Sequence, residues 1–359
     1  MPSTVRSHMV AVALAAVSLG ILAMAAGPPE HSRAARARQT FAATATSAPR
    51  SQVPLKVGMV VLGSNPGVVT TDPIHGLRRA VKELGVHATV LTPTLKEGFA
   101  PSLTSLARQG YDLVFALALP QAYDTVRVAT KFPRTRFVLV DVSTSELDRR
   151  PNNVLGLVFQ EQQVGYLVGY LAALMEDRRA GRHVVSAVGG FKFPPVDRFI
   201  AGFQAGARKA DPEITLLNDY SDDFADPARC KRVAAGQIAR GSGVVFQVAG
   251  RCGLGALDAA REHHVWGIGV DADQSNLGPH ILTSAIKRWD NAVYETIRSF
   301  EKGALPAHGD RLLTLEHGAL ALGKISVRVP RSYISRVDKI RRDIIAGKIK
   351  NIPSSPAAP

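Results

Sequence analysis

The chain of 359 residues is long enough for two domains, and its 46% hydrophobic content can fill two cores, which excludes an intrinsically disordered protein. The formal net charge of +14 raises the question of a nucleic-acid partner. Part of the basic excess lies near the two chain ends, and no helix-turn-helix or interleaved arginine and aromatic pattern occurs. We therefore expect no nucleic-acid binding.

The N-terminus has the order of a secretory signal. Arg6 and His8 precede an apolar run, residues 9–26, and Ala23-Met24-Ala25 places small residues where a signal peptidase reads them. Residues 1–26 are predicted to be a signal peptide that directs export, or an uncleaved anchor, since about 18 apolar residues is the lower limit for spanning a bilayer. No cysteine lies near this site, which excludes lipid attachment through an N-terminal cysteine.

Residues 27–53 are rich in Ala, Ser, Thr, Pro and Arg without apolar periodicity, which predicts a flexible linker. From about residue 54, short β-branched runs alternate with amphipathic helical stretches, and a second series of the same kind follows. The first series is expected as strands 56–62, 87–91, 113–117 and 137–142 with helices 76–84, 102–109 and 122–131. The second is expected as helices 160–175, 195–210, 227–240 and 255–263 with strands 183–188, 214–218, 243–248, 265–270 and 280–285.

This alternation predicts an α/β fold in which two Rossmann-like parallel-sheet lobes are joined by a multi-strand hinge, as in type I periplasmic binding proteins. We expect the N-terminal lobe to comprise residues 54–145 plus about 286–320. The C-terminal lobe should comprise residues 146–285 plus about 321–352, and residues 353–359 should be a disordered tail. Ligands of such sheets bind beyond the carboxyl ends of the strands, so the cleft between the lobes is the expected site.

Sequence motifs of catalysis are missing. There is no His-Glu-x-x-His, no phosphate-binding Gly-x-x-x-x-Gly-Lys-Ser/Thr and no Gly-x-Ser-x-Gly, and the ten histidines lack metal-ligand spacing. We therefore expect no catalytic residue, no metal and no cofactor. Gly250, Gly253 and Gly255 follow a predicted strand, but their spacing differs from the dinucleotide fingerprint, which favours a tight turn whose backbone lines the cleft.

Two carboxylates and one lysine stand at predicted strand ends. Asp141 and Asp271 are expected at carboxyl edges, where each can accept hydrogen bonds from a ligand or instead cap a helix or form an interlobe salt bridge. Lys287 follows the strand 280–285 and is expected either to pair with Asp271 in the cleft or to be a plain surface lysine.

Phe224 is an apolar ring in a loop of charged residues, Asp222-Asp223-Phe224-Ala225-Asp226. This position suits stacking on a flat base, worth about 1–3 kcal/mol when fully formed. Burial of the ring beneath its own loop is the alternative. The chain has only two cysteines, Cys230 and Cys252, and their sequence separation leaves open whether they form a disulfide in the exported protein.

The motifs from residue 56 to residue 353 resemble the basic membrane protein family, whose best-known members are purine nucleoside receptors of bacterial ABC importers. The strongest pair is Gly269–Gln274 followed by Leu282–Asp290. The weaker matches are Asn153-Val154, Phe159-Gln160-Glu161, Gly169–Ala173, Val188-Gly189-Gly190, Phe199, Gly202-Phe203, Gly206, Phe224, Asp226, Val245-Phe246, Ala249-Gly250 and Ala346–Ile349.

The resemblance implies a role for each candidate residue. Phe224 would stack on the base, Asp141 would meet the base edge, Gly250 would offer backbone to the ligand, and Asp271 with Lys287 would hold the ribose. The first loop departs from the family pattern, because Val69 stands where a second stacking Phe belongs and Thr70 where an Asn belongs. Loss of one stacking face would cost about 1–3 kcal/mol of affinity.

The sequence thus indicates an exported, monomeric solute receptor that delivers a nucleoside or a related small polar molecule to the membrane permease of an ABC transporter. A membrane-associated sensor that passes on a signal without transport is the alternative, motivated by the anchor-length apolar segment. A nucleoside hydrolase is a third hypothesis, for which Asp271 and Asp273 are the only candidate carboxylate pair.

Overall fold

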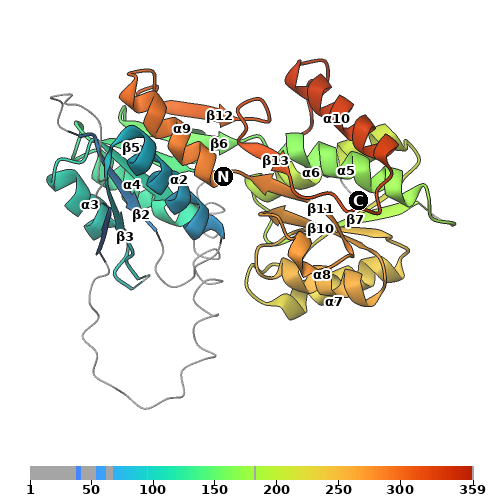
Figure 1. The fold of residues 1–359 in the computed structure, drawn as a ribbon. Helices are drawn as coiled ribbons and strands as arrows, with labels where there is room; N and C mark the ends of the chain where they lie inside the picture. Colours follow the sequence, from blue (N-terminus) through green and yellow to red (C-terminus); the bar gives the residue numbers. More distant parts are fainter. Residues whose placement is uncertain (1–37, 42–53, 62–67, 95, 182, 358–359) are drawn as a thin grey trace, which may run out of the picture. The chain divides into compact units, whose positions relative to one another are not determined.

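The computed structural model describes residues 38–41, 54–61, 68–94, 96–181 and 183–357 (Figure 1). The predicted signal peptide, residues 1–26, lies outside the described residues. So does the predicted linker, residues 27–53, apart from β1 (Arg38–Phe41), which pairs antiparallel with β3 (His87–Leu91). The structure differs here from a linker without secondary structure, because the edge strand β3 offers its backbone groups to an extended segment.

The first of two compact units contains residues 38–41, 54–158 and 289–313 of the described chain. Its sheet has the strand order β1-β3-β2-β4-β5-β6-β12, and β3, β2, β4, β5 and β6 run parallel. The strands besides β1 and β3 are β2 (Lys56–Val60), β4 (Leu113–Leu117), β5 (Arg136–Val140), β6 (Val154–Phe159) and β12 (Gly309–Leu313). Two helix pairs cover this sheet, α2 (Val68–Leu84) with α9 (Trp289–Glu301) and α3 (Ala100–Arg108) with α4 (Ala122–Ala129).

The second unit contains residues 159–288 and 314–357. Its sheet has the order β13-β11-β10-β9-β7-β8, parallel except for β13. The strands are β7 (Val184–Gly189), β8 (Thr215–Tyr220), β9 (Val244–Val248), β10 (Trp266–Asp271), β11 (Ile281–Lys287) and β13 (Leu320–Leu322). The helices are α5 (Glu161–Glu176), α6 (Pro194–Ala210), α7 (Pro227–Ala239), α8 (Gly253–Glu262) and α10 (Arg331–Ile345). Figure 1 shows α5 and α6 on one face of this sheet and α7 and α8 on the other.

The boundary between the units lies at Phe159 rather than near residue 146, because β6 pairs with β5 and extends the first sheet. Later in the chain the crossings lie at residues 288/289 and 313/314. A second, later segment of the chain therefore completes each unit. The α/β fold with two mostly parallel sheets confirms the predicted fold class.

The helix predicted at 160–175 is found as α5, but it is buried along nearly all of its length, so only its predicted amphipathic character is wrong. It lies between the sheet, α6 and α10, which leaves no face for solvent. Glycines make the contact between α5 and α6 close: a side chain at Gly169 would overlap the backbone of Phe203, and one at Gly206 the backbone of Tyr166. The closeness of these backbones explains why small residues recur at four-residue spacing on the facing sides.

Candidate ligand-binding site

The carboxyl edge of the second sheet gathers four of the residues predicted from the sequence. Strands β7, β8, β9, β10 and β11 run parallel, so the loops that follow them leave the sheet at the same edge. Phe224 follows β8, Gly250 follows β9, Asp271 ends β10 and Lys287 ends β11. These residues come from positions up to 63 apart in the sequence, from 224 to 287, and the sheet brings them to one edge.

Phe224 is half-buried, and its ring is held from several directions. The ring lies against Gly190, where any side chain would overlap it. Phe191 and Phe193 contact it edge to face, with ring centroids 5.2 and 5.7 Å away. The ring is therefore neither wholly buried beneath its own loop nor freely rotating in solvent.

The backbone around Phe224 is fixed by a carboxylate on each side. Asp223 Oδ1 accepts hydrogen bonds from the amides of Ala225 (2.6 Å) and Asp226 (3.0 Å). The Asp226 side chain caps α7 by accepting from the amide of Ala228 at 2.9 Å. These bonds satisfy amide groups of the residues that follow Phe224, and they explain the charged residues around an aromatic ring.

Gly250 and Asp271 both have left-handed backbone conformations, with φ of 54° and 64°. The amide of Ala272 donates to the carbonyl of Val270 at 2.8 Å, which makes Asp271 the centre of a three-residue turn. Such a turn is strained for a residue other than glycine, and strained backbones are found where the surroundings impose a conformation at a functional site. The turn directs the Asp271 backbone away from the sheet as soon as β10 ends.

Lys287 is buried, with a side chain 2% exposed, so the reading of a plain surface lysine is wrong. Its Nζ lies 2.9 Å from Oε1 of Glu161, a side chain 0% exposed, and 4.7 Å from the ring centroid of Phe159. Oε2 of the same carboxylate accepts from Nε of Arg198 at 2.5 Å. A buried carboxylate shared by two cations therefore fixes the lysine at the end of β11.

Burial of Glu161 by itself raises the pKa of its carboxyl group. The positive charges of Lys287 and Arg198, and the hydrogen bonds that both donate, outweigh burial and hold that pKa below the ordinary value. Glu161 is therefore ionised at neutral pH. Glu161 is part of the sequence motif Phe159-Gln160-Glu161, but that motif alone predicts no role for its side chain. No local sequence pattern indicates that Arg198 is part of the site.

The carboxyl edge of the first sheet carries Asp141, directly after β5. Its amide donates to the carbonyl of Leu157 at 2.8 Å, and its φ is 67°. Gln121, after β4, is 2% exposed; its Nε2 donates to the carbonyl of Val60 at 3.0 Å, while its Oε1 has no hydrogen-bond partner among the described residues. Sequence reasoning missed this buried amide.

Val69 and Thr70 lie in the first turn of α2, and their side chains are outside the described residues. For these two positions of the first loop, where the sequence departs from the family pattern, the structure therefore describes only the helical backbone. The remaining loop, residues 62–67, also lies outside the described part of the chain.

The two sheets repeat one plan. From β3 the first reads β3-β2-β4-β5-β6-β12, and from β8 the second reads β8-β7-β9-β10-β11-β13. Asp141 after β5 then corresponds to Asp271 at the end of β10, and both have left-handed φ. Ala118 after β4, with φ of 61°, corresponds likewise to Gly250 after β9. In each unit, a residue with positive φ thus lies where the third and where the fourth strand of this series ends.

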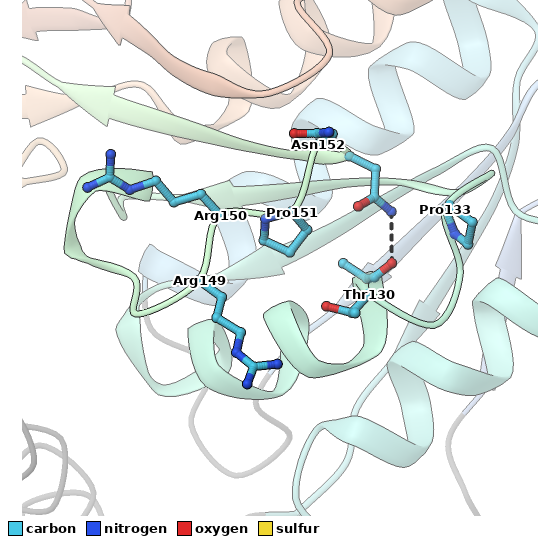
Figure 2. Close-up of a pocket in the computed structure, with 8 residues that line it drawn as sticks. Thr130, Pro133, Arg149, Arg150, Pro151 and Asn152 are labelled. Carbon is cyan, nitrogen blue, oxygen red and sulfur yellow. Dashed lines mark hydrogen bonds between the residues drawn. The ribbon is translucent and has the colours of Figure 1, made fainter.

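A cavity of about 420 Å³ lies at the opposite, amino-terminal edge of the first sheet (Figure 2). It is lined by residues after α4 and before β6, among them Thr130, Arg149, Arg150 and Asn152. Figure 2 shows the two arginine side chains pointing in different directions. None of the predicted site residues lines this cavity.

Three further observations concern metal ligands, membrane-spanning helices and the glycines after β9. Among the described residues, no group of three or more His, Cys, Asp or Glu side chains is placed to hold a metal ion. In the same part of the chain, no helix combines the length and the apolar character needed to cross a bilayer. Gly250 lies in the turn between β9 and α8, whereas Gly253 and Gly255 lie in the first turn of α8, where a side chain at Gly255 would overlap the carbonyl of Pro227.

Residues 56–354 match the model of the Bmp family, described as ABC transporter substrate-binding protein PnrA-like. The chain is 27% identical to the ABC transporter nucleoside-binding protein BmpA of Lactococcus lactis, over 96% of this chain and 98% of that protein. It is 33% identical to an uncharacterized lipoprotein of Pyrococcus horikoshii, over 64% of this chain and 58% of that protein. A solved ABC transporter solute-binding protein of Aeropyrum pernix superposes with a TM-score of 0.69 at 25% identity, covering 84% of this chain and 94% of that one.

Proposed function

The chain belongs to the Bmp family of ABC transporter substrate-binding proteins, and we propose that it is an exported, non-enzymatic receptor that binds a nucleoside and delivers it to a membrane permease. The observation that carries this proposal is the carboxyl edge of the second sheet, where a braced aromatic ring follows β8, a carboxylate ends β10 and a buried lysine ends β11. The name of the Lactococcus lactis relative, a nucleoside-binding protein, supports the choice of ligand.

Each group at this edge suits one part of a nucleoside. The Phe224 ring offers an apolar face to a flat base, which is worth about 1–3 kcal/mol per stacked base. Asp271 accepts hydrogen bonds from ribose hydroxyl groups, and Lys287, held by Glu161, donates to a hydroxyl oxygen. Gly250 presents backbone without a side chain in the way. Asp141, at the corresponding edge of the first sheet, is proposed to meet the base edge.

Val69 and Thr70 are proposed to contact the other face of the base. Because Val69 replaces an aromatic ring there, we expect this receptor to hold a nucleoside less tightly than a member of its family with two stacking rings does. A stacking loss of about 1–3 kcal/mol corresponds to a Kd higher by about five- to 150-fold. A related small polar ligand with less aromatic surface would lose less.

Isothermal titration calorimetry tests the proposal. The full chain is titrated with guanosine, adenosine, inosine, cytidine and uridine, and in parallel with free bases, ribose, glucose and amino acids. We expect one site per chain for at least one nucleoside, and weaker or absent heat for its free base and for ribose. Absence of heat and of any thermal shift with every nucleoside would overturn the proposal.

The same samples test the absence of enzymatic activity. After long incubation of the protein with each nucleoside, chromatography is expected to recover the intact nucleoside. Release of free base would instead revive hydrolysis at Asp271 and Asp273.

A further inference from the structure

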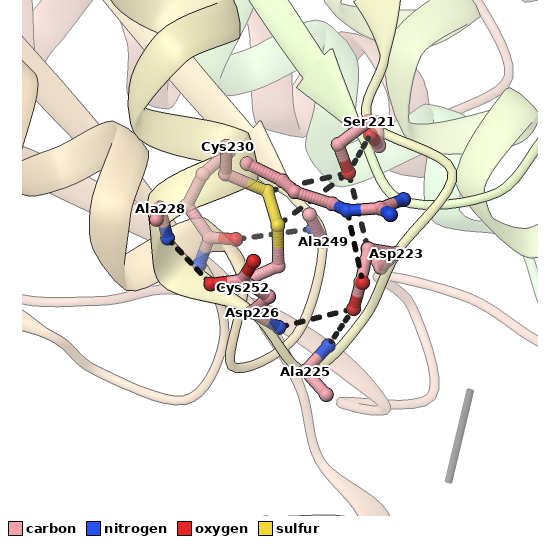
Figure 3. The surroundings of a disulfide bond; sticks show 11 residues. Ser221, Asp223, Ala225, Asp226, Ala228, Cys230, Ala249 and Cys252 are labelled. Atoms are coloured by element: carbon pink, nitrogen blue, oxygen red, sulfur yellow. Dashed lines mark hydrogen bonds and ion pairs between the residues drawn. A yellow bond between two sulfur atoms is a disulfide. The ribbon is translucent and has the colours of Figure 1, made fainter. Parts of the chain in front are cut away.

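A disulfide between Cys230 and Cys252 lies directly beneath the Phe224 loop (Figure 3). Their Cα atoms are 5.5 Å apart, and both residues are 0% exposed. Cys230 lies in the first turn of α7, whereas Cys252 is the N-cap residue of α8. The bond thus joins the first turn of α7, directly after the loop that carries Phe224, to the loop that carries Gly250, between β9 and α8.

Hydrogen bonds connect this disulfide to the backbone of the candidate site. The amide of Cys252 donates to the carbonyl of Phe224 at 3.1 Å. Ser221 Oγ lies 3.3 Å from Sγ of Cys230 and 3.5 Å from Sγ of Cys252, and it lies 3.2 Å from the carbonyl of Gly189. The disulfide and this hydroxyl group therefore link the loops after β7, β8 and β9.

The helices on which the cysteines lie have other contacts. A side chain at Gly255 would overlap the carbonyl of Pro227, so α7 and α8 already approach closely without the disulfide. The cysteines also belong to an apolar cluster of small side chains, with Ala234, Ala249 and Ala256 among its members. We therefore expect the fold to survive loss of the bond, while the loops beyond the helix starts lose a constraint.

We propose that the Cys230–Cys252 disulfide is a positioning element of the ligand site, which holds the Phe224 ring in its stacking position by fixing its loop to the Gly250 loop. This inference rests on the proposed function. The bond makes no contact with the ligand. It acts by lowering the freedom that the aromatic ring and its loop would lose when a base binds.

A double-mutant cycle tests this role. Cys230→Ala combined with Cys252→Ala removes the bond and leaves apolar side chains in an alanine-rich cluster. In the wild-type background we expect the Kd for the best-bound nucleoside to rise about three- to tenfold, the equivalent of ordering one or two side chains. In a Phe224→Ala background we expect the same pair of substitutions to change the Kd less than twofold, because the ring to be positioned is gone.

A purely structural role of the bond would lower the melting temperature without a special effect on the Phe224 ring. Loss of the bond would then change the Kd by the same factor in both backgrounds, or in neither of them. Either of these two results for the Kd overturns the inference. The second readout is the rate of amide hydrogen exchange. We expect loss of the bond to increase this rate more in residues 221–226 and 249–253 than in β9. Should the alanine pair fail to fold, the wild-type chain refolded under a phosphine reductant keeps both sulfur atoms and takes its place.

Failure of the wild-type chain to bind any nucleoside would refute the proposed function itself, whereas equal affinity with and without the bond refutes only the inference.

Discussion

Substitution of Glu161 by Gln tests the buried charge cluster that fixes Lys287. The Glu161 and Lys287 side chains are 0% and 2% exposed, and that of Arg198 is 12% exposed, so water cannot replace the lost carboxylate charge around either cation. Removing one partner of such a buried pair costs about 3–5 kcal/mol of the free energy of unfolding. The matched control is Glu262→Gln, where both partners of the Lys231 ion pair are 38–44% exposed and the expected cost is below about 1 kcal/mol.

The assay is urea unfolding followed by far-UV circular dichroism, with the midpoint and the slope determined for both variants. The pKa of Glu161 is lowered in the folded protein, so its contribution is fully present above pH 4.5, the ordinary value, and is lost as the pH falls through the folded value. The difference between the wild type and Glu161→Gln should therefore shrink in acid. An equal loss of unfolding free energy in the two Gln variants at neutral pH would show that the buried carboxylate stabilises the fold no more than the exposed one does.

Phe224→Ala is expected to raise the nucleoside Kd in calorimetry by the equivalent of about 1–3 kcal/mol, and an unchanged Kd would show that the ring does not touch the base. Val69→Phe is expected to lower that Kd by supplying the second ring, and the absence of any gain would place Val69 away from the base. Asp271→Asn tolerates the φ of 64°, so we expect weaker binding at an unchanged urea midpoint; a lower midpoint with intact binding would assign Asp271 a structural role. Gly206→Val should lower the free energy of unfolding by about 1–3 kcal/mol, since its side chain overlaps the Tyr166 carbonyl, and a wild-type midpoint would contradict this close approach.

Periodicity predicted the strands of both sheets better than the helix starts. The strands at 87–91 and 113–117 are found at the predicted bounds. Helix α2 begins at Val68 rather than near Gly76, although β-branched residues and Pro73 precede that glycine. The propensity cost of β-branched residues is only tenths of a kcal/mol each, and packing of α2 against α9 outweighs it.

Strand β6 was not predicted, because the expected rhythm placed a helix between consecutive strands. The chain instead passes from β5 to β6 with only a short 3-10 turn at Thr144–Glu146. Asp310, far along the chain, accepts hydrogen bonds from the amide and hydroxyl of Thr144 and so holds this connection. Contacts of such long sequence separation leave no local pattern.

For the site residues too, local sequence patterns predict the position in the sheet but not the contacts made with distant parts of the chain. Strand ends locate Asp141, Asp271 and Lys287 at carboxyl edges, since parallel strands deliver their last residues to one side of the sheet. The burial of Lys287 depends on a carboxylate 126 residues earlier in the chain, which its local sequence does not reveal. The aromatic neighbours of Phe224 lie in a different strand-to-helix loop, and their contact likewise depends on the pairing of β7 with β8.

A crystal structure of the full chain grown with its best-bound nucleoside tests the central claim most directly. We expect the Phe224 ring to stack on the base, Asp271 and Lys287 to lie within hydrogen-bond distance of ribose oxygens, and Asp141 to lie at the base edge. A nucleoside bound elsewhere, such as in the cavity beside Arg149, or these four side chains facing solvent on separate surfaces, would contradict it.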